Sequence, residues 1–246
     1  MRLFIFTLIF FKISSFANAN TIFYLTKIPN LKVYELKTNN GIKYLTAERP
    51  FKVGIVQNNV QCGVASDDEI KTSFPIIKAN FDKYEKGFLR KVNLKYVVIC
   101  KNLKVSNINT AGVPNHNVKT LIIDIGFDKK YFERSLHHEL FHMIDDSYND
   151  LFSKKNWEKF NSLPFKYADC STCTNKLDLS LINNTSGFLT EYSMSTASED
   201  MAEIFSFLMT DNKKISEITL SDNIINKKVS FLKNEINKID VNFKFD

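Results

Sequence analysis

The chain has 246 residues, 44% of them hydrophobic, and a formal net charge of +6 at pH 7. This length and composition are enough to build the core of one domain or of a closely joined pair. The lysines are spread among asparagine and aspartate residues rather than gathered into one run, which argues against a nucleic-acid-binding or anionic-membrane-binding protein.

Residues 1–19 are typical of an export signal. Arg2 precedes an apolar run over residues 3–11, and Ala17 and Ala19 supply the small residues of a cleavage site. The run is shorter than the roughly 20 residues that a spanning helix needs. We therefore expect cleavage after Ala19, a mature charge of +4 after the loss of Arg2 and Lys12, and a secreted or periplasmic protein without stable membrane insertion. A retained membrane anchor or an uncleaved N-terminal helix is the alternative.

Predicted strands precede predicted helices along residues 20–246, which show no repeat or flexible linker and are treated as one domain. Beta-type runs and buried strands are predicted at residues 21–25, 31–36, 53–56, 94–100 and 119–125, with a turn-rich segment at 111–117. Helical spacing is predicted at residues 77–92, 129–148 with Asp128 as its cap, 197–209 and 224–239. The predicted fold class is α+β.

The four cysteines form an even set, which in an exported protein indicates disulfides. Three pairings are possible, and we favour Cys170–Cys173 as a local clip together with Cys62–Cys100. The alternative for Cys170 and Cys173 is half of a metal site, but the chain has no second cysteine pair to complete it.

The strongest chemical signal is His138-Glu139-Leu140-Phe141-His142. Histidines four residues apart lie on one face of a helix, so both imidazoles can reach one metal ion. Glu139 is placed to act as the general base on a water activated by that metal. The alternative is a chance match on a surface helix. The pattern therefore favours a single catalytic Zn²⁺ site.

A third ligand is required, because catalytic zinc usually has three protein ligands and one open position. The metzincin pattern is excluded because Asp145 and Tyr148 occupy the positions of its glycine and its last histidine. Glu199 is the best candidate, at the start of a predicted helix. The alternatives are Glu203, Glu191, Asp169 and Asp178.

Other polar residues near the motif have smaller predicted roles. Asp145 lies on nearly the same helical face as His138 and could orient a ligand imidazole. Glu203, if it is not a ligand, could support one or lie on the surface. Asp146 is expected to be exposed, and His116 and His137 are expected to be ordinary polar residues.

HELFHMIDDSY, with a downstream tyrosine followed after six residues by ExxAExF, resembles the gluzincin metallopeptidases related to the catalytic domain of anthrax lethal factor and to the secreted Pro-Pro endopeptidases. The resemblance covers roughly residues 119–239. It implies a zincin-like domain, with a twisted mixed N-terminal sheet, the HExxH helix and a helical C-terminal subdomain. It implies that His138, His142 and Glu199 hold one Zn²⁺, that Glu139 is the base and that Tyr192 donates to the developing oxyanion.

The interval between His142 and Glu199 is longer than in these relatives and contains the cysteine pair. It is either an inserted, disulfide-clipped loop that shapes specificity, or a sign that the third ligand is another acid. The predicted function is a zinc endopeptidase acting on protein or peptide substrates, with residues 119–125 as a sheet-edge strand that pairs with an extended peptide. The alternatives are an inactive binding protein of the same fold and a zinc amidase for cell-wall peptides. The sequence does not predict the oligomeric state.

Overall fold

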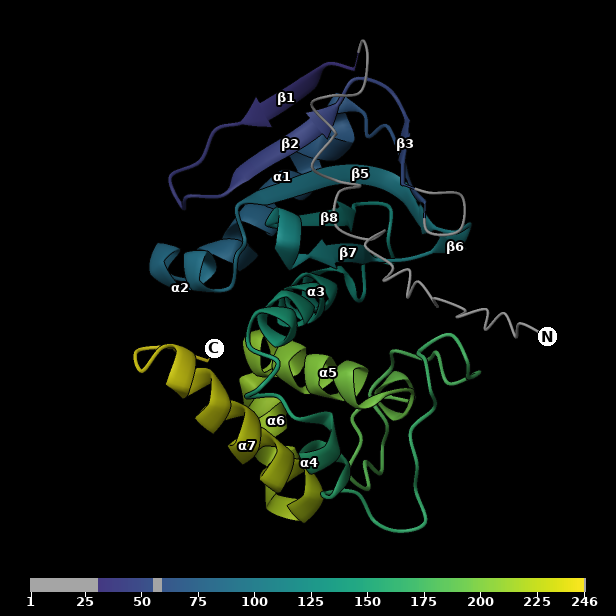
Figure 1. The fold of residues 1–246 in the computed structure, drawn as a ribbon, viewed down its shortest axis with the longest axis vertical. Helices are drawn as coiled ribbons and strands as arrows, with labels where there is room; N and C mark the ends of the chain where they lie inside the picture. The colour runs from purple at the N-terminus through teal and green to yellow at the C-terminus, as the bar shows by residue number, and fades with distance from the viewer. Residues whose placement is uncertain (1–30, 55–58, 246) are drawn as a thin grey trace, which may run out of the picture.

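A mixed sheet packs against a layer of helices, with α3 between the sheet and the remaining C-terminal helices (Figure 1). The computed structural model describes residues 31–54 and 59–245. The expected export signal, the strand at 21–25 and part of the strand at 53–56 lie outside the described residues. The mixed sheet and the helices that follow it agree with the α+β class expected from the sequence.

The sheet is built around one long strand that belongs to two ladders. The first half of β5 (Tyr96–Val105) pairs in parallel with β2 (Lys43–Ala47) on one side and with β8 (Thr120–Asp124) on the other. The second half pairs with β4 and β6. The outer strands are β1 (Val33–Leu36) beside β2, β3 (Phe51–Val53) beside β4 (Val60–Gly63), β6 (Ile108–Asn109), and β7 (Gly112–Asn115) beside β8.

The predicted edge strand at residues 119–125 is an inner strand, so that prediction was wrong. Every residue of β8 is buried, and β8 has β5 on one side and β7 on the other. The edge is β7, within the segment predicted to be turns. Gly112, Pro114 and Asn115 are turn-type residues, but an outer strand accepts a proline because its outward position needs no ladder donor.

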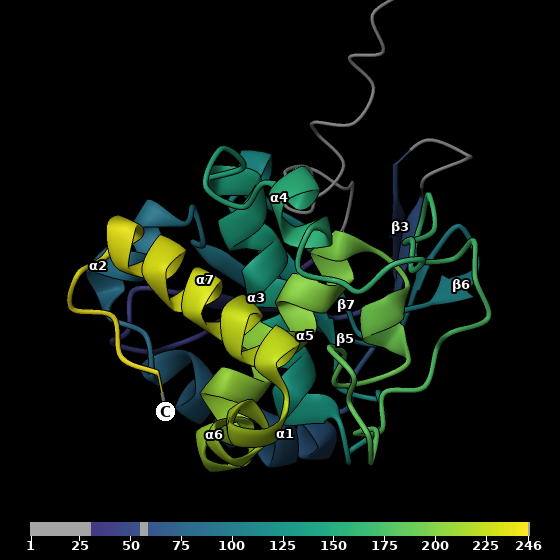
Figure 2. The same cartoon turned by 90° about the horizontal axis from the view of Figure 1, so that it is seen from below.

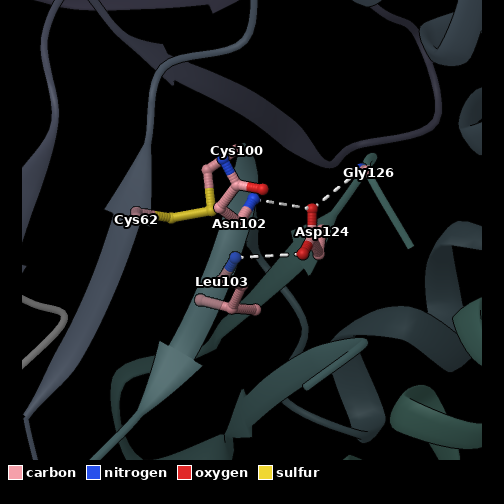
Figure 3. Close-up of a disulfide and its surroundings, with 6 residues drawn as sticks. All are labelled: Cys62, Cys100, Asn102, Leu103, Asp124 and Gly126. Atoms are coloured by element: carbon pink, nitrogen blue, oxygen red, sulfur yellow. Dashed lines mark hydrogen bonds between the residues drawn. A yellow bond between two sulfur atoms is a disulfide. The ribbon is translucent and has the colours of Figure 1, made fainter. Parts of the chain in front are cut away.

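A bulge bends β5 where it passes from one ladder to the other (Figure 3). The register between β4 and β5 shifts beside Cys62, and Asn102 has a left-handed φ of 55°. The buried carboxylate of Asp124 accepts hydrogen bonds from the backbone N–H groups of Asn102 (3.1 Å) and Leu103 (3.0 Å). The Cys62–Cys100 disulfide joins the two strands at the same place, as predicted.

Replacing Asp124 with alanine is expected to lower the free energy of unfolding by about 2 to 3 kcal/mol, because the N–H groups at the bulge lose their acceptor away from water. Equilibrium urea unfolding measures this difference. The matched control is Asp150→Ala at an exposed position. Equal stability of the two variants would contradict the role of Asp124 at the bulge.

The helices follow the sequence pattern closely at the metal-motif segment and less closely elsewhere. The predicted helix at 77–92 is two helices, and the first begins earlier because Ser66 and Glu69 form a capping box. The helix expected from residue 129 begins three residues later, and Asp128 caps only the preceding turn. The helices are α1 (Asp67–Asp82), α2 (Lys86–Lys91), α3 (Phe132–Ser147), α4 (Lys154–Glu158), α5 (Ala197–Thr210), α6 (Asn212–Ser221) and α7 (Asn223–Ile239).

Two apolar cores lie on the two faces of the sheet. Val97 and Ile99 of β5 face the larger core with the helices, whereas Val98 faces the smaller core under β3 and β4, as the two-residue alternation of a strand requires. Seen from below, α7 crosses over α3 and α5, which closes the larger core (Figure 2). Among residues 31–54 and 59–245, no helix has the length and apolarity needed to cross a bilayer.

Candidate metal centre

Helices α3 and α5 bring three metal-ligand side chains to one point. The Nε2 atoms of His138 and His142 lie 3.2 Å apart. Oε2 of Glu199 lies 2.8 Å from Nε2 of His138 and 3.2 Å from Nε2 of His142. Tetrahedral zinc, bound at about 2.0–2.1 Å by nitrogen and oxygen, holds its ligand atoms roughly 3.3 Å apart. The triangle formed by these three atoms therefore has the size that a bound zinc ion requires.

Local sequence explains how Glu199 reaches the two imidazoles. The hydroxyl of Thr196 accepts a hydrogen bond from the backbone N–H of Glu199 and caps the start of α5. The cap fixes Glu199 in the first turn of a helix that packs directly along α3. A carboxylate in the first turn is also favoured by the helix dipole.

A second carboxylate, that of Glu203, bonds to His138 through the ring nitrogen that faces away from the ligand triangle. Oε1 of Glu203 lies 3.0 Å from Nδ1 of His138, and the side chain of Glu203 is buried. Its other oxygen accepts from the hydroxyl of Thr190 at 2.9 Å and pairs with Arg134 at 3.5 Å. With Nδ1–H donating to Glu203, His138 turns its Nε2 lone pair toward the ligand triangle.

His142 is supported through a hydroxyl. Oγ of Ser198 lies 3.4 Å from Nδ1 of His142 and donates to Oδ2 of Asp145 at 2.9 Å. Asp145, expected from the sequence to orient an imidazole, is buried and contacts His142 by way of Ser198. Sequence reasoning missed Ser198, although its position directly before Glu199 was the available signal.

The electrostatics of the site favour a positive charge among its carboxylates. Burial alone lowers the pKa of His138, but hydrogen bonds to Glu199 and Glu203 outweigh it and raise the pKa to about 10. Burial raises the pKa of Glu199, but the charges of His142 and His138 outweigh it and hold the pKa well below its ordinary value. A divalent cation at the ligand triangle supplies the same positive charge.

Glu139 lies beside the ligands without joining them. It is buried, which raises its pKa, and the neighbouring His138 and His142 partly offset this. Gly112 of β7 packs against it so closely that a Cβ atom there would lie 2.6 Å from Cγ of Glu139. A glycine at this place in the edge strand is what lets Glu139 occupy its position.

Tyr192 faces the site from the 3-10 turn η3 (Tyr192–Met194). Its ring centroid lies 5.8 Å from that of His138. Burial, then the charges of Glu199 and Glu139, raise the pKa of the phenol above its ordinary value, so the hydroxyl keeps its proton.

A pocket of about 670 Å³ opens beside these residues. Its lining includes His138, Glu139 and Tyr192, together with apolar side chains such as Ile108 and Leu177 and several uncharged serine and threonine side chains. The walls come from the β5–β6 hairpin, the start of α3 and the loop that contains the predicted Cys170–Cys173 disulfide, which is formed.

The remaining candidates stand apart from the ligand triangle. His137 is buried and turned toward Tyr84 and Asn80, and His116 pairs with the half-exposed Asp146. In the described part of the chain, the group with metal-ligand geometry comprises His138, His142 and Glu199. The alternative ligands Glu191, Asp169 and Asp178 lie outside it.

Replacing Glu203 with glutamine is expected to weaken zinc binding about 10- to 100-fold, because the imidazole of His138 loses the carboxylate that orients it. Competition with a chromophoric chelator measures the affinity. Glu217→Gln, on the exposed side of α6, is the matched control and should bind zinc as the wild type does. Identical affinities for both variants would remove Glu203 from the site.

Comparison with known proteins finds one matching protein family and a similar solved structure. Residues 90–243 match the model of a family described as "Putative zinc-binding metallo-peptidase", and this segment holds every residue of the site. A "putative zinc-binding metallo-peptidase" from Bacteroides caccae ATCC 43185 is a similar solved structure, with 17% identity, a TM-score of 0.47, and coverage of 71% of this chain and 72% of that one. No protein with curated annotation matches.

Proposed function

Because this chain belongs to the family of zinc-binding metallo-peptidases, we propose that it is an exported, gluzincin-type zinc endopeptidase. His138, His142 and Glu199 hold the zinc ion, and Glu139 is the general base. The observation that carries the proposal is the convergence of three ligand atoms within 3.2 Å of one another, with a free carboxylate beside them. Both disulfides are formed, which suits an oxidising compartment.

The residues around the ligand triangle divide the work of amide hydrolysis. A zinc ion held by His138, His142 and Glu199 would supply a Lewis acid for the peptide carbonyl and for the attacking water. The carboxylate of Glu139 takes the proton of the attacking water and passes it to the leaving amine. Burial of Glu139 among the ligands and Gly112 limits the bulk water that competes for this carboxylate.

Tyr192 completes the site as a hydrogen-bond donor. The phenol keeps its proton, and its ring is tilted against that of His138 with the two centroids 5.8 Å apart. A neutral hydroxyl fixed beside the reacting carbonyl stabilises the negative charge that develops on the carbonyl oxygen.

The outer strand β7 is the strand that pairs with the backbone of the peptide substrate. An extended peptide adds to a sheet edge by backbone hydrogen bonds, which are independent of its sequence. Gly112 of β7 packs directly on Glu139, so a peptide along this edge passes beside the base. This assignment replaces the inner strand β8, which has neighbours on both sides.

Zinc analysis and peptide cleavage test the proposal together. The purified protein is expected to carry one zinc ion per chain and to cleave members of a peptide library read by mass spectrometry. His142→Ala should lose both properties, because two remaining ligands bind zinc poorly. His116→Ala, at the histidine that pairs with Asp146, is the matched control and should keep both. A His142→Ala protein that retains zinc and activity would refute the ligand assignment, and cleavage confined to cell-wall peptides would narrow the substrate class to amides of that kind.

A further inference from the structure

Two large apolar side chains remain exposed in the pocket beside the proposed metal centre. Ile108 in β6 is 55% exposed and Leu177 is 57% exposed, and both line the pocket. They come from segments far apart in sequence, and the loop that carries Leu177 lies on the same side of the molecule as β6 (Figures 1 and 2). Phe127 and Leu179 continue the apolar lining. Scattered exposed leucines need no explanation, but apolar side chains gathered in one pocket indicate a binding surface.

The pocket contains one guanidinium group, and it is already engaged. The Nη2 atom of Arg134 donates to the backbone carbonyl of Leu179 and lies 3.5 Å from a carboxylate oxygen of Glu203. The guanidinium also lies over the ring of Phe207 at 4.4 Å, and its side chain is only 13% exposed. Because this charge is paired and covered, the part of the pocket away from the metal ligands presents a mainly uncharged surface.

The wall that carries Leu177 is fixed relative to the reactive end of the pocket. The Cys170–Cys173 disulfide closes the turn ahead of it. The backbone N–H of Tyr192 donates to the carbonyl of Asp178 at 3.1 Å, directly after Leu177. A wall fixed in this way relative to Tyr192 can hold a substrate side chain at a constant distance from the reacting carbonyl. Such a fixed distance is needed if the pocket is to select the residue at one position of the substrate.

We propose that Ile108 and Leu177 select a large, uncharged apolar side chain on the residue next to the scissile bond of a peptide substrate. The inference rests on the proposed function and names the substrate class of the same site. An apolar side chain in the pocket removes Ile108 and Leu177 from water, whereas a carboxylate or an ammonium group loses its hydration without gaining a partner.

The test compares cleavage preferences of zinc-loaded variants. Leu177→Lys and Ile108→Lys are expected to lower kcat/KM about 10-fold for peptides that have leucine or phenylalanine next to the scissile bond. The same variants should lose less, or gain, for peptides with glutamate there. Leu220→Lys is the matched control, because Leu220 is 90% exposed on α6 and does not line the pocket. Zinc content and thermal midpoint are measured for each variant to show that the fold and the metal are retained.

A second readout does not depend on turnover. Zinc-loaded Glu139→Ala protein should bind a leucine-containing peptide more tightly than its glutamate counterpart, and adding Leu177→Lys should remove that difference. Wild-type cleavage with a preference that neither lysine variant changes would overturn the inference and leave the proposed function standing. A zinc-loaded wild type that cleaves no peptide would overturn both.

Discussion

Glu139→Ala protein is expected to retain one zinc ion and to lose peptide hydrolysis by a factor of at least about 10² to 10⁴, the usual contribution of a positioned general base. Zinc stays because Glu139 lies outside the triangle of His138, His142 and Glu199. Turnover fails because the one carboxylate of that triangle, Glu199, is assigned to the metal and is not free to accept the proton. Single-turnover cleavage of a fluorogenic peptide, with zinc measured on the same sample, records both properties.

Glu158→Ala is the matched control for this substitution, since Glu158 is exposed on α4 and belongs to neither the ligand triangle nor the pocket lining. It should cleave at the wild-type rate. Wild-type turnover in the Glu139→Ala protein would contradict the role of Glu139 as general base. Loss of zinc from that variant would show that Glu139 is part of the metal site.

Asp200→Ala is expected to lower the free energy of unfolding by about 3 to 5 kcal/mol, because it leaves a buried ammonium group without its counter-charge. Asp200 and Lys228 are both fully buried, with Nζ and Oδ2 2.6 Å apart. Trp157 and Tyr167 donate to the same carboxylate oxygen at 2.8 and 2.6 Å. Burial raises the pKa of Asp200 and lowers that of Lys228, and their mutual attraction offsets part of this cost. Urea unfolding measures the loss.

A double substitution separates the pair from its surroundings. Asp200→Asn with Lys228→Met removes both charges and should recover most of the stability lost in Asp200→Ala. The exposed pair of Asp68 and Lys71 is the control, and Asp68→Ala should leave stability unchanged. A double variant as unstable as Asp200→Ala would show that packing, rather than the unpaired charge, causes the loss. Because Asp200 follows Glu199 on α5, zinc affinity is measured on the same proteins.

Most of what the sequence could predict about the site came from short-range residue spacing. The four-residue spacing of His138 and His142 determines a shared face as soon as the segment is helical, and it is helical in α3. Glu199 could be proposed from its chemistry, but its distance to the imidazoles depends on the packing of α5 on α3, which no local pattern encodes. The structure places Glu199 with the two histidines, and the catalytic roles remain predictions.

The errors come from contacts between distant segments. Gly112, Pro114 and Asn115 have turn propensities, and only pairing with β8 makes their segment a strand. Ser198 reaches His142 and Asp145 across two helices, so its role has no spacing signature. The sequence favoured both cysteine pairings correctly. The short separation indicated Cys170–Cys173, and the second pair followed because two cysteines remained.

The Cys62–Cys100 disulfide lies at the bulge in β5, and the same strand continues into one wall of the pocket. The strand leaves the central sheet, turns at Asn102 beside Cys62 and Cys100, and continues into the hairpin that carries Ile108. The disulfide therefore joins β4 and β5 at the base of the hairpin that forms one wall of the pocket. Reduction of this disulfide would remove the covalent link between the two strands at the base of that wall, whereas His138 and His142 lie on α3, which contains no cysteine.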